Sequence, residues 1–529
     1  MTSSHQGSGA LNPAAEIMGD AQGSGAVPSQ QKVVHQGIKW LGFSLGFSRV
    51  LRLATTVILV RLLAKSDFGV IALANGAILA MSAFREVGFS QALIHRKCSD
   101  AEDERLSADT VFWILVVTNT LLFGIGFVLT PWVASWFEEG FTSLVPVLRA
   151  MLVLFVIEGL MITPLALLQK RLKFRSVSIL EMRATFTYAV TAVGCALLGM
   201  GVWSLVVGQV VSRGLQAWWL SRMAGFLPRM RWDSTIAAEL FRYGRWLWAV
   251  SALQAFGRAG DRILLGRIAG GAVLGTYGVA FNLCNAPAKP VSNVINRIAF
   301  PALTRIGDDL VRVAASLRSA FALVTLVALP AAVGLAVVAE EFILTVYGRN
   351  WLDMVPIVRV LAFYGCALAV GTIARPVLLA TGRPWAVFYI GVGKEVLFFA
   401  LLFYAYFRPN MLAQPAILIA VAVAIPMLLS VVIGLQQAIV ACRGDGKAML
   451  GDFFRTLWCA SLMVGVVTLV GLGTQGHGYR LALVLKVIVG VGSYWAAASF
   501  FHAEALNNLK TQFDGIRKSR ESQGRTPNH

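Results

Sequence analysis

The chain has 529 residues, of which 57% are hydrophobic and only 14% are charged, and its mean hydropathy is +0.69. Soluble globular domains carry about 25% charged residues, so this composition excludes a soluble protein and indicates a polytopic membrane protein. The formal net charge of +19 lies largely in short turns and in the C-terminal tail, not in one basic, aromatic-rich face, which argues against a nucleic-acid partner.

The N-terminal segment and the apolar runs after it define the expected elements. Residues 1–36 are rich in Ser, Gly and Gln and lack the basic start and apolar core of a signal peptide, so we expect a disordered cytoplasmic tail. Each later run can cross about 30 Å of hydrocarbon as a helix. About fourteen transmembrane helices are expected, at 39–63, 68–94, 109–133, 144–168, 178–200, 202–223, 243–267, 272–300, 315–338, 354–380, 385–407, 412–441, 451–472 and 479–502.

The turns between these runs alternate in charge. One set is rich in Lys and Arg, for example around 96–105, 170–175 and 222–231, whereas the other holds single basic residues beside glutamates such as Glu139 and Glu340. Because Lys and Arg stay on the cytoplasmic side, this pattern predicts that both termini are cytoplasmic and that the number of spans is even.

The two halves of the chain resemble each other. Positions 52 and 258 are both Arg and positions 69 and 275 are both Gly, and the members of each pair lie 206 residues apart. Six spans per half make this repeat parallel, and transporters commonly bind substrate between such halves. The expected segments are the tail at 1–36, an N-lobe of helices 1–6 at 37–226, an interfacial linker helix at 227–243, a C-lobe of helices 7–12 at 244–442, helices 13–14 at 443–503, and a basic cytoplasmic tail at 504–529.

Arginines within the predicted spans are candidates for a substrate site. Arg49 and Arg52 lie three residues apart and share one face of the first helix, and Arg258, Asp261 and Arg262 share a face of the seventh. An ionisable group near the bilayer centre costs a few kcal/mol, and by default it marks a substrate or ion pathway. The alternative is a structural pair with a carboxylate of a neighbouring helix.

A second basic candidate lies in the eighth span. Lys289 is flanked by Pro287 and Pro290, which remove backbone donors, and Asn285 lies one turn before it. We predict that Arg52, Arg258 and Lys289 converge on one anionic group. Asn285, Arg49 and Arg262 complete the expected substrate-binding set.

Carboxylates inside the spans are candidates for ion coupling. Glu158 in the fourth span, Glu395 beside Lys394 in the eleventh, and Asp261 could carry a proton, because burial disfavours the charged form of a carboxylate. Pairing of Glu158 with Arg213 or with another helix is the alternative, and a structural role is favoured for Asp261. Arg85 is as compatible with a gate contact as with a site.

The sign of the charges inside the spans and the positions of Cys and His indicate which ligands the protein can bind. Basic residues outnumber acidic ones inside the predicted spans, so a central cavity would suit phosphate or pyrophosphate, which the planar Arg fork binds well. The six cysteines are scattered singly, and the six histidines lie at the ends of spans or in tails. We therefore expect no metal and no cofactor.

Four stretches carry a family resemblance. They are VRLLAKSDFGVIALA at 60–74, GFSQALIHRK at 88–97, PLALLQKRLKFRS at 164–176, and GDRILLGRIAGGAVLGTYGVAFNL through IAFPALTRI between 260 and 306. As a set they resemble Wzx-type polysaccharide flippases, the polysaccharide transporter branch of the MOP superfamily, from about residue 37 to 442. The resemblance implies an all-α integral membrane fold, a V-shaped bundle of two six-helix lobes plus two C-terminal helices.

The same resemblance implies a transporter and not an enzyme. It would flip undecaprenyl-diphosphate-linked oligosaccharide repeat units across the bacterial cytoplasmic membrane by alternating access, for exopolysaccharide, capsule or O-antigen synthesis, alongside a polysaccharide polymerase and a chain-length regulator. The alternatives are a cation-coupled drug or other lipid exporter of the same superfamily, which should depend on interior carboxylates, and a membrane-embedded polymerase. A polymerase would usually show a sizeable loop outside the membrane, and the predicted turns are all short.

Overall fold

The structure is a computed structural model that describes residues 27–85, 89, 93, 96, 100–137, 143–171, 174–306, 309–407, 415–474 and 478–501. Side chains at 27–43, 243–254, 258 and 287–306, among others, lie outside the description. Its elements are α2 (Val27–Leu62), α3 (Lys65–Met81), η2 (Ser82–Phe84), α5 (Ala101–Ser135), α6 (Leu144–Lys170), α7 (Phe174–Leu197), α8 (Val202–Ala224), α9 (Ser234–Ile306), α10 (Leu310–Val337), α11 (Ala339–Val346), η4 (Arg349–Met354), α12 (Val355–Ala380), α13 (Pro384–Tyr406), α14 (Pro415–Cys442), α15 (Gly446–Gly473) and α16 (Tyr479–Phe501).

Helices make up all the regular structure of the described residues, which confirms the predicted all-α membrane class. The expected spans 243–267 and 272–300 both lie within α9, which breaks at Gly270, where φ is 75° and only glycine is comfortable. Ten helices of the described chain are long and apolar enough to cross a membrane, so the count of about fourteen stays a prediction. The helix α2 begins at Val27, so residues 27–36, expected in the tail, are helical.

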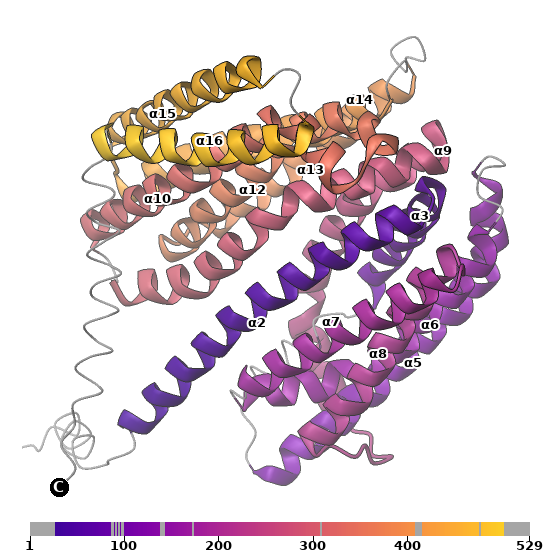
Figure 1. The fold of residues 1–529 in the computed structure, drawn as a ribbon. Coiled ribbons are helices and arrows are strands. Elements are labelled where there is room, and N and C mark those ends of the chain that lie inside the picture. Colours follow the sequence, from indigo (N-terminus) through magenta and orange to yellow (C-terminus); the bar gives the residue numbers. More distant parts are fainter. Residues whose placement is uncertain are drawn as a thin grey trace, which may run out of the picture.

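The helices form two groups with a third pair outside them. Figure 1 shows α2 to α8 gathered on one side and α9 to α14 on the other, with α15 and α16 covering the outer face of the second group. We call the first group the N-lobe and the second the C-lobe. The two lobes meet where α3 packs along α9, and one apolar core of buried side chains continues from α3 and α6 into α9 and α12.

Two glycines allow this close packing of α3 on α9. A Cβ atom on Gly69 would lie 1.8 Å from the carbonyl oxygen of Gly271, and one on Gly275 would lie 2.1 Å from that of Lys65. Apolar side chains gain little by leaving lipid, so helices in a membrane associate through close backbone packing at small residues. Gly69 and Gly275 are members of the same repeat pair, and they lie together where the halves meet.

Polar contacts join the two lobes beside Gly69 and Gly275. Lys65 Nζ lies 2.7 Å from Asp353 Oδ1, and the Thr276 hydroxyl donates to Asp353 Oδ2 over 3.3 Å. Arg61 donates to two carbonyl groups at the end of α11 over 2.7 and 3.0 Å. We call Arg61, Lys65, Thr276 and Asp353 the junction cluster, because it joins the N-lobe to the C-lobe.

Ion pairs attach α15 and α16 to the C-lobe. Arg318 of α10 contacts Asp452 of α15 over 2.8 Å, and Lys486 of α16 forms an ion pair with Glu341 of α11. The Tyr494 hydroxyl donates to a carbonyl of α10 over 2.7 Å. These three contacts join the two helices that lie outside the repeat to α10 and α11.

The segment between the lobes is bound to the N-lobe. The predicted linker helix at 227–243 is helical from Ser234 and continues without a break into α9. Its apolar residues Ile236 and Leu240 are buried among side chains of α5 and α6, whereas Phe241 is exposed. Whether the segment lies on the membrane interface stays a prediction, but its buried face packs on protein.

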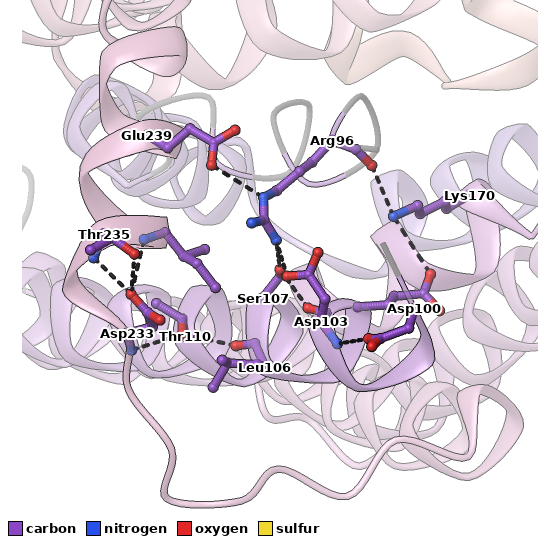
Figure 2. A network of polar contacts seen from close by, with 12 residues as sticks. Arg96, Asp100, Asp103, Leu106, Ser107, Thr110, Lys170, Asp233, Thr235 and Glu239 are labelled. Carbon is purple, nitrogen blue, oxygen red and sulfur yellow. Dashed lines mark hydrogen bonds and ion pairs between the residues drawn. The ribbon is translucent and has the colours of Figure 1, made fainter. Parts of the chain in front are cut away.

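Figure 2 shows the polar contacts that hold this segment. The Arg96 guanidinium donates to Asp103 over 2.6 Å and to Glu239 of α9 over 3.3 Å. Asp233 caps the start of α9 by accepting hydrogen bonds from Thr235. The Thr235 hydroxyl and then the backbone N–H groups of the first turn hold the pKa of Asp233 below its usual range. The first turns of α9 are therefore anchored to the N-lobe.

Candidate functional site

Two neighbouring cavities lie between the N-lobe and the second half of α9. The larger, of about 600 Å³, is bounded by α2, α6, α7, α8 and α9, and we call it the arginine chamber. The smaller, of about 490 Å³, is lined by residues of α3 and by Gly275, where α3 packs on α9, and we call it the junction chamber. They are neighbours, because they share the lining residues Thr56, Tyr188, Gln209, Val279 and Asn282.

The chambers follow each other along the helix axes. Leu220, near the C-terminal end of α8, lines the arginine chamber. Leu205, near the N-terminal end of the same helix, lines the junction chamber. On α6 the order agrees, with Leu165 lining the first and Glu158 lining the second. The junction chamber therefore lies at the end of the bundle closed by the junction cluster.

Three arginines face the arginine chamber. Arg49 and Arg52 come from adjacent turns of α2 and Arg213 comes from α8, while Glu181 of α7 is the acidic lining residue. The charges of Arg213 and Glu181 both act on Arg52. Arginine stays protonated in proteins, so the chamber keeps a net positive charge. The sequence placed Arg49 and Arg52 in a cavity, and the structure puts both there.

Arg213 is the partner predicted for Glu158 as the alternative to ion coupling, but it lines the arginine chamber, and Glu158 pairs with Arg85. Its Nη1 donates to Gln216 Oε1 over 3.0 Å. A polar stripe could have identified it from the sequence, because Gln209, Ser212, Arg213 and Gln216 have the spacing of one helix face. All four line the arginine chamber.

The junction chamber brings charges from both lobes together. Arg85, just after η2, forms an ion pair with Glu158 of α6. This contact is the interhelical partnership that was the alternative to ion coupling for Glu158. Arg262 of α9 lines the same chamber, and its guanidinium lies 5.9 Å from the centroid of the Phe281 ring. The two chambers together are lined by five arginines and two glutamates.

Two predicted carboxylates lie apart from the residues that line these chambers. Asp261 is buried and accepts a hydrogen bond of 2.9 Å from the Tyr277 hydroxyl, which ties the two parts of α9 together across Gly270. Glu395 is buried in the C-lobe, 2.7 Å from Lys394 Nζ, and a Cβ on Gly257 would lie 2.0 Å from it. Ion coupling by Glu158, Glu395 or Asp261 stays a prediction.

The remaining predicted residues differ in what the structure describes of them. Asn285 is buried and donates to the carbonyl of Phe281 over 2.8 Å. One turn earlier, Asn282 lines both chambers. The side chains of Arg258 and Lys289 lie outside the described residues, so their convergence with Arg52 stays a prediction.

Ligand-type side chains are dispersed in the part of the chain that the structure describes. There, no group of three or more His, Cys, Asp or Glu side chains is close enough to hold a metal ion. The chemistry that the cavity offers is electrostatic, since guanidinium groups bind phosphate and carboxylate oxygens through paired donors.

Comparison with known proteins gives consistent results. A family model described as "Polysaccharide biosynthesis protein" matches residues 58–356. The chain is 26% identical to the teichuronic acid biosynthesis protein TuaB of Bacillus subtilis (strain 168), over 72% of this chain and 78% of TuaB. It is 24% identical to the lipopolysaccharide biosynthesis protein WzxC of Escherichia coli (strain K12), over 68% of this chain and 73% of WzxC.

Solved structures share the fold at low identity. The inward closed conformation of the lipid II flippase MurJ aligns with a TM-score of 0.70 at 14% identity, covering 88% of this chain and 99% of MurJ. An inward-facing multidrug transporter of the MATE family aligns with a TM-score of 0.60 at 13% identity, covering 75% of this chain and 94% of that one. These alignments confirm the MOP-type bundle predicted from the sequence.

Proposed function

The chain belongs to the polysaccharide biosynthesis protein family, as a Wzx-type member of the MOP superfamily, and from this premise we propose that it flips undecaprenyl-diphosphate-linked oligosaccharide units across the bacterial cytoplasmic membrane. The family match to polysaccharide biosynthesis proteins and the fold shared with a lipid flippase and a drug transporter support a transporter and not an enzyme. The proposed cycle is alternating access, with the substrate held between the lobes and released for polysaccharide synthesis.

One observation carries the proposal, namely the excess of arginines that line the two neighbouring chambers. Five arginines against two glutamates give a cavity that attracts an anion. A diphosphate fits this cavity because each guanidinium can donate two parallel hydrogen bonds to phosphate oxygens. An exporter of cationic drugs shares the fold, but it would need a cavity of the opposite sign. Cooperation with a polymerase and a chain-length regulator stays a prediction from the family.

Depletion of the protein tests the proposed function. In cells that need this protein for polysaccharide export, depletion should leave lipid-linked repeat units on the cytoplasmic leaflet, because synthesis of the unit continues while its flipping stops. Leaflet-specific lectin or enzymatic labelling of inverted and right-side-out vesicles measures this accumulation. Complete, normally oriented repeat units on the outer leaflet after depletion would contradict the flippase function.

The orientation of the chain is a separate proposal. We expect both termini in the cytoplasm, which puts the junction cluster near the outer surface and the arginine chamber nearer the cytoplasm. A Glu139→Cys variant, made after removal of the native cysteines, should react with an impermeant maleimide from outside the cell. The matched Arg171→Cys variant, in an oppositely directed turn, should react only in opened cells. The reverse labelling of both sites would refute this orientation.

A further inference from the structure

The Arg85–Glu158 ion pair faces the junction chamber and is not sealed in the protein. Both residues line the chamber, and their side chains are 26% and 24% exposed. Arg262 lines the same chamber from the C-lobe. The chamber therefore has one arginine from each lobe, and the arginine of the N-lobe already contacts an internal carboxylate.

A carboxylate on a guanidinium makes the same kind of contact as a phosphate. Both present two oxygen atoms to the donor fork of arginine. Glu158 Oε2 contacts Arg85 Nη1, which is one of the donors that a phosphate oxygen would use. Because both side chains are partly exposed and line the chamber, a released Glu158 would remain at the wall of the chamber.

We propose that the junction chamber is a second binding site for the diphosphate group, at which the anion displaces Glu158 from Arg85 and bridges Arg85 to Arg262. This inference rests on the proposed function and adds a second position to it. The headgroup first occupies the arginine chamber at Arg49, Arg52 and Arg213. It then passes the shared polar residues Thr56, Gln209 and Asn282 toward the junction end.

Glu158 acts in this scheme as an internal competitor. It neutralises the junction chamber while the headgroup is absent, and it weakens binding there by occupying Arg85. An anion held between Arg85 and Arg262 contacts both lobes next to the α3–α9 crossing. Occupancy of the second position is therefore linked to the packing of the lobes.

Binding of a short lipid diphosphate tests the proposal. We use the purified full-length protein in detergent, with farnesyl diphosphate as probe and farnesol and inorganic pyrophosphate as comparisons. Glu158→Gln should tighten farnesyl diphosphate binding by about ten-fold, because the competing carboxylate loses its charge. Arg262→Gln, added to Glu158→Gln, should cancel this gain. Glu158→Asp, which keeps the charge but shortens the reach, should give a smaller gain.

The control is Glu102→Gln, which removes a carboxylate that pairs with Arg231 over 3.1 Å outside the chambers. It should leave the affinity unchanged. The same tightening for inorganic pyrophosphate would assign the effect to the diphosphate, whereas tightening for farnesol would contradict the proposal. Thermal unfolding of each variant establishes that it is folded before its affinity is compared.

The two proposals fail in different ways. If wild-type protein binds the probe and the Arg52→Gln, Arg213→Gln variant does not, but both Glu158 variants bind as wild type, then the second site is wrong and the proposed function stands. This result would mean that Glu158 serves only proton coupling or the stability of the fold. If wild-type protein does not bind the diphosphate, the proposed function fails and the second site fails with it.

Discussion

Replacing Arg52 and Arg213 together with glutamine is expected to abolish export in a cell where this protein limits polysaccharide export. Arg52 on α2 and Arg213 on α8 both line the arginine chamber, and their positive charges are close enough to repel each other. A charge-assisted hydrogen bond contributes roughly 1.5–3 kcal/mol, so losing the donors of both side chains should reduce substrate binding by at least about 100-fold.

The pattern of partial losses distinguishes arginine from positive charge alone. Lysine keeps the charge but loses the paired donors, so Arg52→Lys should reduce export by about ten-fold and not abolish it. Export is measured as surface polysaccharide at matched protein levels in the membrane. Arg222→Gln is the matched control, because Arg222 lies on the same helix as Arg213 and stacks over Trp218, 4.3 Å from the ring centroid.

The same export assay tests the prediction that Arg52, Arg258 and Lys289 converge on one anionic group. Arg52→Ala, Arg258→Ala and Lys289→Ala together should remove export if these residues share one anionic ligand. Full complementation by this triple variant would rule out their shared pocket. Normal export by the Arg52→Gln, Arg213→Gln variant would be a stronger contradiction, because it would show that the arginine chamber does not bind the substrate.

Substituting Gly275 with alanine is expected to open the packing between α3 and α9. The new Cβ would lie 2.1 Å from the carbonyl oxygen of Lys65, and this backbone atom cannot move aside as a flexible side chain can. Overpacking typically costs about 1–3 kcal/mol, which changes the population ratio of two lobe arrangements by about five-fold to more than about 100-fold. Export should fall, because the cycle needs the closed junction.

Cross-linking measures the closed junction directly. Lys65 and Asp353 form an ion pair of 2.7 Å at the tips of their side chains, so Lys65→Cys and Asp353→Cys, in a protein without its native cysteines, should be joined by a bifunctional thiol reagent about as long as the ion pair. Gly275→Ala should reduce the yield by about ten-fold. Gly278→Ala is the control one turn away, where the new Cβ would make an ordinary contact of 3.5 Å with Ala72. Equal yields in both variants would show that the Gly275 crossing does not control closure.

The sequence alone determined the fold class, the places of most helices and two of the arginines that line the arginine chamber. Long apolar runs have few alternatives in a membrane, because helices satisfy all their backbone hydrogen bonds within the segment. The positions of Arg49 and Arg52 followed from the same logic, since charges three residues apart on an apolar helix share a face that avoids lipid. The repeat-related Gly69 and Gly275 were visible too, although their contact was not.

Only the tertiary structure decided which charges meet. Helical periodicity orients a side chain on its own helix, but the partner helix and its rotation depend on packing between segments far apart in sequence. Arg85 thus pairs with Glu158, whereas Arg213 turns to the arginine chamber. Asn282 lines the chambers while Asn285 is buried, because the rotation of α9 against the N-lobe selects between residues nearly one turn apart. That rotation is fixed by backbone contact at the glycine crossing, which no single helix encodes.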